Sequence, residues 1–91
     1  MSEKRYTDNI QSDLEVALTH HSAGRLSEAE DIYRQILKTS PKHPVALHLL
    51  GVKSHQVGRN DIAIKLINKA IAEEPNYAEA HNNLGLALHA A

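Results

Sequence analysis

The chain contains no cysteine, tryptophan or phenylalanine, and only three tyrosines among its 91 residues. Without cysteine it can form neither a disulfide nor a thiolate metal site, and it has no cysteine nucleophile. The formal net charge is −1, so no bulk electrostatic attraction to nucleic acid or to an anionic membrane is expected. No apolar run approaches the ~20 residues of a transmembrane helix, and the charged N-terminus lacks the apolar stretch of a secretory signal. These absences predict a cytoplasmic protein.

What the chain does contain is a repeat with one constant period, the interval that separates Gly24 from Gly58. Residues 10–57 match residues 44–91 at nine positions, where chance would give about two or three. The matches include all four glycines and two of the three prolines. They are His21/His55/His89, Gly24/Gly58, Arg25/Arg59, Ala29/Ala63, Pro41/Pro75, Ala46/Ala80, Leu50/Leu84 and Gly51/Gly85. A fixed period of this length is typical of repeat architectures.

Each unit predicts two amphipathic helices. After Gly58, apolar residues recur at helical spacing, Asn60 and Asp61 are N-cap candidates, and Pro75 ends the segment. The equivalent helix of the first unit opens with Ser27 and Glu30, the spacing of a capping box.

The first helix of the second unit is predicted from about Pro44 to Val57, since proline suits a first helical turn. Gly51 lies inside this helix, and Gly85 lies inside its copy. Glycine in a helix costs about 1 kcal/mol against alanine, so both positions predict a close approach of a neighbouring helix. Gly24 and Gly58 lie just beyond helix ends, where a left-handed residue closes the turn.

These positions make the chain, from about Ile10 onward, resemble the tetratricopeptide repeat family. The matched positions are a large apolar and a small residue in the first helix, a turn glycine, a small residue and an aromatic in the second helix, and a closing proline. They fall on Val16/Leu50/Leu84, Ala17/Gly51/Gly85, Gly24/Gly58, Ala29/Ala63, Tyr33 and Pro41/Pro75. Departures are Ile67 at the aromatic position, and Asp13, Leu47 and His81 where the family often has tryptophan.

The resemblance implies an all-α helical-hairpin solenoid of about five helices. Residues 1–9 would form an N-terminal extension, residues 10–43 and 44–77 two complete repeats, and residues 78–91 the first helix of a third. The runs ALTHHSAGRLSEAEDIYRQIL, ALHLLGVKSHQVGR and AEAHNNLGLAL are also similar to N-terminal arrays of bacterial O-linked N-acetylglucosamine transferase-like or sulfotransferase proteins. This second resemblance implies a segment of a substrate-presenting array.

No catalytic constellation is visible, so the chain is predicted not to be an enzyme and to need no cofactor. Ser12 and Ser27 are better explained as helix caps, and the glycines stand alone rather than forming a phosphate-binding loop. The seven histidines include no HExxH motif and no metal site is predicted, although the row His21, His55 and His89 could bring two imidazoles together. The simpler interpretation is that histidine is a tolerated, half-polar residue beside a groove.

In the family, the first helix of each repeat lines a concave face, and this implies a peptide-binding groove here. Its predicted residues are Leu14, Leu18, His21, His48, Val52, His55, Asn82, Leu86 and His89. Gln11, Val45 and Glu79 occupy equivalent positions. No groove position carries Lys or Arg, which disfavours a chaperone-tail carboxylate as ligand. Asn83 fits the family's asparagine ladder, whereas Glu15 and Leu49 occupy its two preceding positions.

The sequence therefore predicts a protein-interaction module that binds a peptide or a partner helix. One alternative is that the apolar groove residues only support the stack of helices. A second is that the chain is the substrate-recognition end of a glycosyltransferase-like enzyme. A third is a self-assembly element, a homodimer formed through an uncovered face at Leu84, Ala87 and Leu88. No nucleic-acid or membrane partner is predicted.

Overall fold

The computed structural model describes residues 2–91, with side chains from Ile10 onward. Within these residues the chain forms five helices and no strand. The helices are α1 (Ser2–Ser22), α2 (Leu26–Thr39), α3 (Pro44–Gln56), α4 (Asn60–Glu73) and α5 (Ala78–Ala90). The predicted all-α class and the two helices per unit are confirmed. The starts of α2 and α4 are separated by the same interval as Gly24 and Gly58, and so are the starts of α3 and α5.

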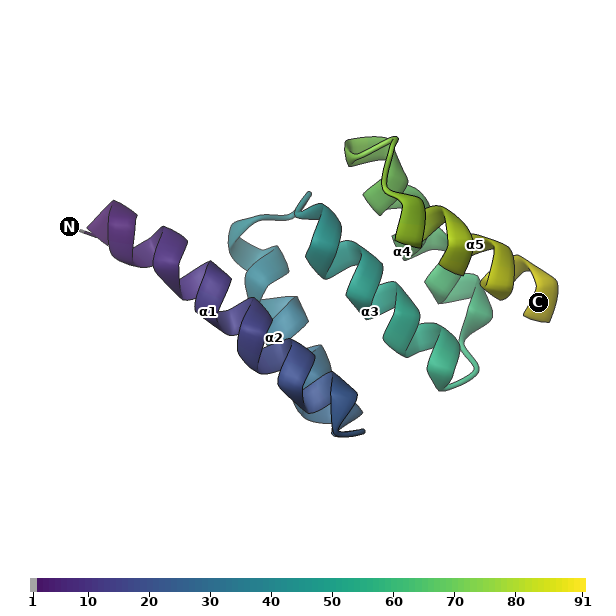
Figure 1. Cartoon of the computed structure of the whole chain (residues 1–91), viewed down its shortest axis with the longest axis horizontal. Helices are drawn as coiled ribbons and strands as arrows, with labels where there is room; N and C mark the ends of the chain where they lie inside the picture. Colours follow the sequence, from purple (N-terminus) through teal and green to yellow (C-terminus); the bar gives the residue numbers. More distant parts are fainter. Residues whose placement is uncertain (1) are drawn as a thin grey trace.

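The helices form two layers, as Figure 1 shows: α1, α3 and α5 lie side by side in the nearer layer, with α2 and α4 behind them. Each helix packs against the next in the chain, and α3 also touches α5. The molecule is elongated along this row, with extents of 46 × 28 × 19 Å. The nearer surface, made by α1, α3 and α5, is called the groove face below.

Small residues allow this close packing. Alanines that recur at the repeat interval are fully buried between the helices, among them Ala29 and Ala63 on the second helices and Ala46 and Ala80 on the first. Large side chains fill the space left over, with Tyr33 and Ile67 fully buried at equivalent positions of α2 and α4. Burial raises the pKa of Tyr33 to about 12.

The predicted side-chain caps of the second helices are wrong. Both α2 and α4 begin one residue after an arginine, Arg25 or Arg59, and neither has a side-chain cap hydrogen bond. A guanidinium has no acceptor to offer, so neither arginine side chain can cap the first turn of its helix. A cap that was not predicted occurs at α3, where His43 Nδ1 accepts from the Ala46 backbone N–H at 3.3 Å.

The predictions for the four glycines have different outcomes. Gly24 and Gly58 have φ of 82° and 84°, so the left-handed turn is confirmed at both. A Cβ on Gly51 would lie 2.7 Å from Ile67 Cγ1, which confirms the close approach of α4. At Gly85 the same prediction is wrong, because a Cβ there would meet nothing within 4 Å. Among the described residues, α5 contacts α4 of the preceding unit, but no second helix of its own unit packs on it in the way that α4 packs on α3.

Alanine substitution of these two equivalent glycines should therefore have opposite effects on stability. We expect Gly51→Ala to destabilise the protein by about 1–3 kcal/mol, because α4 must move away. Gly85→Ala should stabilise it by about 0.5–1 kcal/mol, because an open helix position gains a better helix former. Thermal unfolding followed by circular dichroism measures both, and shifts of the same sign would contradict the packing described here.

Candidate functional site: a cavity on the groove face

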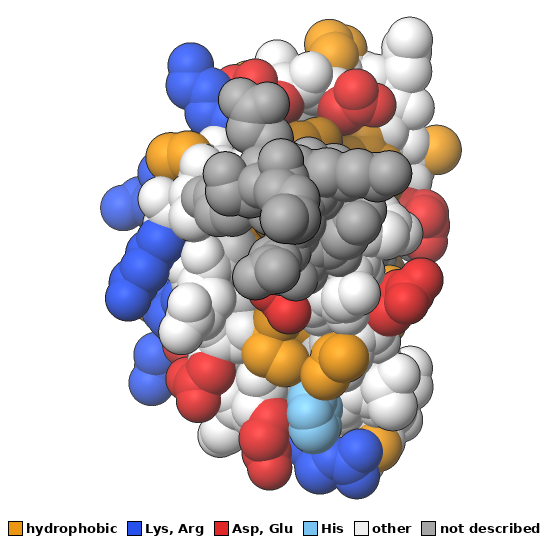
Figure 2. Space-filling model, turned by 90° about the vertical axis from the view of Figure 1, so that its left-hand side faces the viewer, with side chains coloured by type: hydrophobic (Ala, Val, Ile, Leu, Met, Phe, Trp, Pro, Cys, Tyr) orange, Lys and Arg blue, Asp and Glu red, His pale blue; other side chains and the backbone are white. Residues whose placement is uncertain are grey.

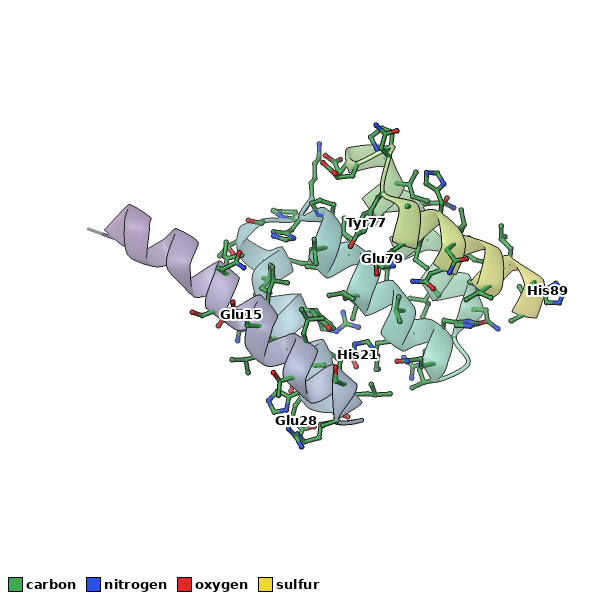
Figure 3. The ribbon with its side chains drawn as sticks, in the orientation of Figure 1. Glu15, His21, Glu28, Tyr77, Glu79 and His89 are labelled. Carbon is green, nitrogen blue, oxygen red and sulfur yellow. The ribbon has the colours of Figure 1, made fainter. Side chains whose placement is uncertain are left out.

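A cavity of about 350 Å³ opens on the groove face where three successive first helices meet. Its wall is largely aliphatic, from Leu18 on α1 and Val45 and Leu49 on α3. Its polar side is formed by three further residues, His48 on α3, Tyr77 just before α5, and Glu79 in the first turn of α5. Figure 3 shows Tyr77 and Glu79 next to each other at the start of α5, facing the gap between α5 and α3.

His48 is the polar centre of this site. It is only 3% exposed, and a buried imidazole is costly unless both nitrogens are paired. Asn83 Nδ2 donates to His48 Nε2 at 2.8 Å. A neutral imidazole accepts at one nitrogen and donates at the other, so Nδ1–H donates to the Tyr77 hydroxyl oxygen at 2.9 Å. The hydroxyl proton of Tyr77 is then left to be donated to another group.

The protonation states of this side of the cavity follow from burial. Burial lowers the pKa of His48, and the nearby Glu79 carboxylate opposes that effect. The pKa of Tyr77 is raised by burial first and then by Glu79 and Glu74. At neutral pH both rings are therefore uncharged, and Glu79 is the charged group of the cavity lining.

A second histidine makes a similar link one repeat earlier. His21 Nε2–H on α1 donates to Gln56 Oε1 at the end of α3, at 2.8 Å. His21 Nδ1 accepts from the Tyr33 hydroxyl on α2 at 3.1 Å. The bonds of His21 and His48 thus each join one repeat to the next. His55, by contrast, bonds to Asn60 in its own unit at 2.7 Å, and His89 is exposed.

The other predicted groove residues are distributed unevenly. Leu18 and His48 line the cavity, whereas Leu14 is buried against Ile36 and Ala46 and offers little surface to a ligand. Val52 is half-buried. Asn82 and Leu86 are exposed, like His89.

Two residues of the cavity were missed by the sequence analysis, Leu49 and Tyr77. Tyr77 stands one repeat after His43, and both residues directly precede a first helix. This shared position was the sequence signal from which Tyr77 could have been identified. Asn83, the candidate ladder residue, has its amide engaged by His48.

The residues predicted for self-association also differ from one another. Ala87 is fully buried against α4, and Leu84 packs at the edge of the same cluster. Leu88 is 54% exposed, whereas its equivalent one repeat earlier, Ser54, is only 6% exposed. The uncovered part of this face is therefore centred on Leu88.

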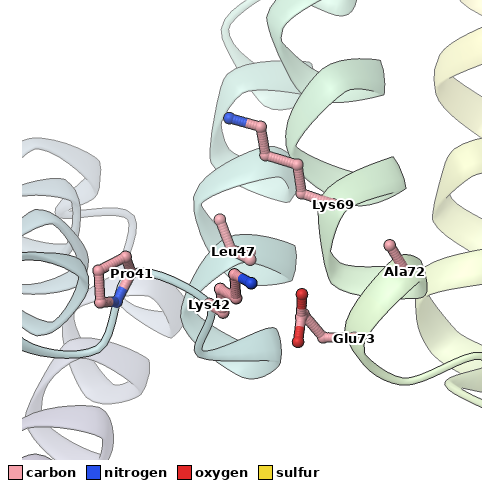
Figure 4. A pocket seen from close by; sticks show the side chains of 6 residues that line it. All are labelled: Pro41, Lys42, Leu47, Lys69, Ala72 and Glu73. Atoms are coloured by element: carbon pink, nitrogen blue, oxygen red, sulfur yellow. The ribbon is translucent and has the colours of Figure 1, made fainter.

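A second cavity of about 350 Å³ lies where the α2–α3 loop approaches α4 (Figure 4). Leu47 and Ala72 form apolar surface there, next to Pro41. The rim carries charges of both signs, from Lys42, Lys69 and Glu73. Unlike the lining of the cavity on the groove face, this rim therefore includes two lysines, set against one glutamate.

The described residues contain neither a cluster that resembles a metal centre nor a membrane span. No three histidine or carboxylate side chains in this part of the chain come together as metal ligands would. None of the helices described here is long and apolar enough to cross a bilayer.

Known proteins share this architecture. A family model described as "Tetratricopeptide repeat" matches residues 20–91. An O-GlcNAc transferase mutant from Thermobaculum terrenum is 30% identical with a TM-score of 0.89, over 90% of this chain and 16% of that one. The Sgt2 TPR domain from Aspergillus fumigatus is 23% identical with a TM-score of 0.84, over 90% of this chain and 54% of that one. The first TPR of Spaghetti (RPAP3), bound to the HSP90 peptide SRMEEVD, is 22% identical with a TM-score of 0.83, over 89% and 64%. The chain thus spans less than two thirds of each of these proteins.

The environment of His48 predicts a specific pH dependence. Its pKa in the folded protein lies below 6.5, so below pH 6.5 the unfolded chain binds a proton that the folded chain does not. Stability should therefore fall as the pH drops below 6.5, until the folded pKa is reached. NMR titration of the His48 ring should give a midpoint below 6.5, and Glu79→Gln should lower it further. A midpoint at or above 6.5 would contradict the buried, neutral imidazole.

Proposed function

Because the chain belongs to the tetratricopeptide repeat family, we propose that it binds a short peptide segment of a partner protein on its groove face. The observation that carries this proposal is the cavity shared by α1, α3 and α5. An apolar wall beside a few hydrogen-bonding groups suits one anchoring side chain and its neighbouring backbone. The Tyr77 hydroxyl supplies a donor for a peptide carbonyl.

In this proposal the exposed part of the groove face extends the contact beyond the cavity. Leu18 and His48 hold the anchor, while Val52, Leu86, Asn82 and His89 contact the flanking residues of the peptide. The module acts as a binding protein rather than an enzyme, and its predicted location is the cytoplasm.

The acidic peptide SRMEEVD of the RPAP3 complex is a poor guide to the ligand here. The cavity lining contains no Lys or Arg to receive its carboxylates, and it does contain Glu79. A different class of peptide is therefore proposed for this groove.

The similarity to the O-GlcNAc transferase mutant favours a second proposal, that the chain is the substrate-recognition segment of a larger glycosyltransferase-like enzyme. Sequencing the gene beyond the codon for Ala91 tests it directly. A reading frame that encodes a glycosyltransferase domain supports this proposal, and a stop codon or an unrelated domain contradicts it.

The groove proposal predicts that a neutral polar substitution in the cavity abolishes peptide binding. Leu18→Asn should lose binding to peptides selected from a phage-displayed random library, because the apolar wall is interrupted. Ile62→Asn on α4 is the matched control, since Ile62 is 40% exposed against 42% for Leu18 but lies in the other layer. Fluorescence anisotropy with labelled peptides measures both, and circular dichroism checks that both remain folded. Equal losses in the two variants would move the binding site off the groove face.

The exposed face of α5 gives a prediction about self-association through Leu88. Two chains that meet there should give a dimer mass in light scattering at high micromolar concentration, because burying a leucine is worth about 1.5–3 kcal/mol. Leu88→Glu should restore the monomer, whereas Leu86→Glu should not, although Leu86 is equally exposed at 52%. A monomer mass for the parent chain would rule out this dimer.

A further inference from the structure

The basic side chains are unevenly distributed between the two layers of the molecule, whereas acidic side chains occur in both. Over the described side chains, Lys53 is the only lysine or arginine on α1, α3 and α5. The other seven lie on α2, α4 and the loops. They are Arg25, Arg34, Lys38, Lys42, Arg59, Lys65 and Lys69. Figure 2 shows most of the lysine and arginine side chains along its left edge, the side of α2 and α4, with others at its lower end.

Lys53 itself is not available to an anionic ligand. Its side chain is 11% exposed and forms an ion pair with Glu30 of α2. Glu30 also pairs with Arg34 at 2.7 Å. Hydrogen bonds from Lys53 and then from Arg34 lower the pKa of Glu30, so this carboxylate stays ionised and the lysine stays neutralised.

Acidic groups of the groove face are not neutralised in this way. Glu79 lines the cavity, and Glu74 is close enough to Tyr77 to affect its ring. Glu15 is exposed on α1, and Figure 3 places it along that helix. None of these three carboxylates has an ion pair within the part of the chain that the structure describes. His48 adds no positive charge at neutral pH, because it is buried.

We propose that the cavity selects a basic peptide, in which an apolar side chain stands next to lysine or arginine. The inference rests on the proposed peptide-binding function and adds the chemistry of its partner. The apolar side chain enters between Leu18, Val45 and Leu49, and the neighbouring ammonium or guanidinium pairs with the Glu79 carboxylate.

An acidic ligand is excluded by the same charges. A carboxylate or phosphate placed in the cavity would lie against Glu79 and would find no lysine or arginine in the lining. Like charges brought together cost binding free energy, so discrimination comes from repulsion as well as attraction.

Three labelled nine-residue peptides test this inference. Each has one central leucine, flanked on both sides by two lysines, two glutamines or two glutamates. Fluorescence anisotropy at about 50 mM salt should rank the affinities as lysine, then glutamine, then glutamate. One partly exposed ion pair gives roughly a threefold advantage to lysine over glutamine, and the exchange of attraction for repulsion gives roughly tenfold over glutamate. The ranking should weaken at about 500 mM salt.

Two variants test whether the preference for the lysine peptide arises at the cavity. Glu79→Gln should lower the affinity for the lysine peptide about threefold and leave the glutamine peptide unchanged. Glu28→Gln is the matched control, because Glu28 is exposed in the first turn of α2 rather than at the cavity. This control should change neither affinity.

The possible outcomes separate this inference from the proposed function. If the glutamine peptide binds and Leu18→Asn abolishes that binding while the three peptides bind equally, the groove stands and the preference for basic peptides is overturned. A preference for the glutamate peptide also overturns it. If none of the three peptides binds, both the inference and the proposed groove fail.

Discussion

The close packing of α4 on α3 at Gly51 is the contact on which the rest of the structure depends. A side chain at that position would lie 2.7 Å from Ile67, so the two helices can approach only because none is present. Ala63 and Ile67 are fully buried under this contact. It closes the central hairpin and thereby fixes where α3 stands relative to its neighbours. The cavity is lined by α3 and by its neighbours α1 and α5, so it depends on the position of α3 between them.

Hydrogen-bonded histidines extend this order from one hairpin to the next. His48 reaches Tyr77 at the end of its own unit and Asn83 of the following unit, and His21 reaches Gln56. These hydrogen bonds lie within the protein, and they satisfy both nitrogens of each imidazole. The groove face therefore combines structural hydrogen bonds with the proposed binding surface, and a substitution at His48 would alter both. Leu18 and Glu79 are exposed lining residues, so substitutions there are better suited to test the proposed binding alone.

Much of the fold could be predicted from the repeat period of the sequence, since glycine, proline and alanine mark turns and close contacts through their backbone properties. The left-handed turn predicted at Gly58 is confirmed for this reason. The close approach predicted at Gly85 is wrong, because a glycine inside a helix marks a close contact only where a second helix lies against it. The repeat pattern shows which residues recur, but it does not show which helices are neighbours. The hydrogen-bond partners of His48 could not be predicted from the sequence either. They depend on side chains 29 and 35 residues away, and the equivalent positions hold Leu14 and Asn82 rather than histidine.

The order of contacts along the chain has a kinetic consequence. Helices pack mainly against the helix that follows them in sequence, apart from the contact between α3 and α5. Chains dominated by such local contacts need little loop closure before they gain stabilising interactions, and they fold in microseconds to milliseconds. A stacked repeat can also begin to fold at any unit and spread from there. The central hairpin, with the tightest contact, is the natural place for this chain to start, and the outer helices then add to a template that already exists.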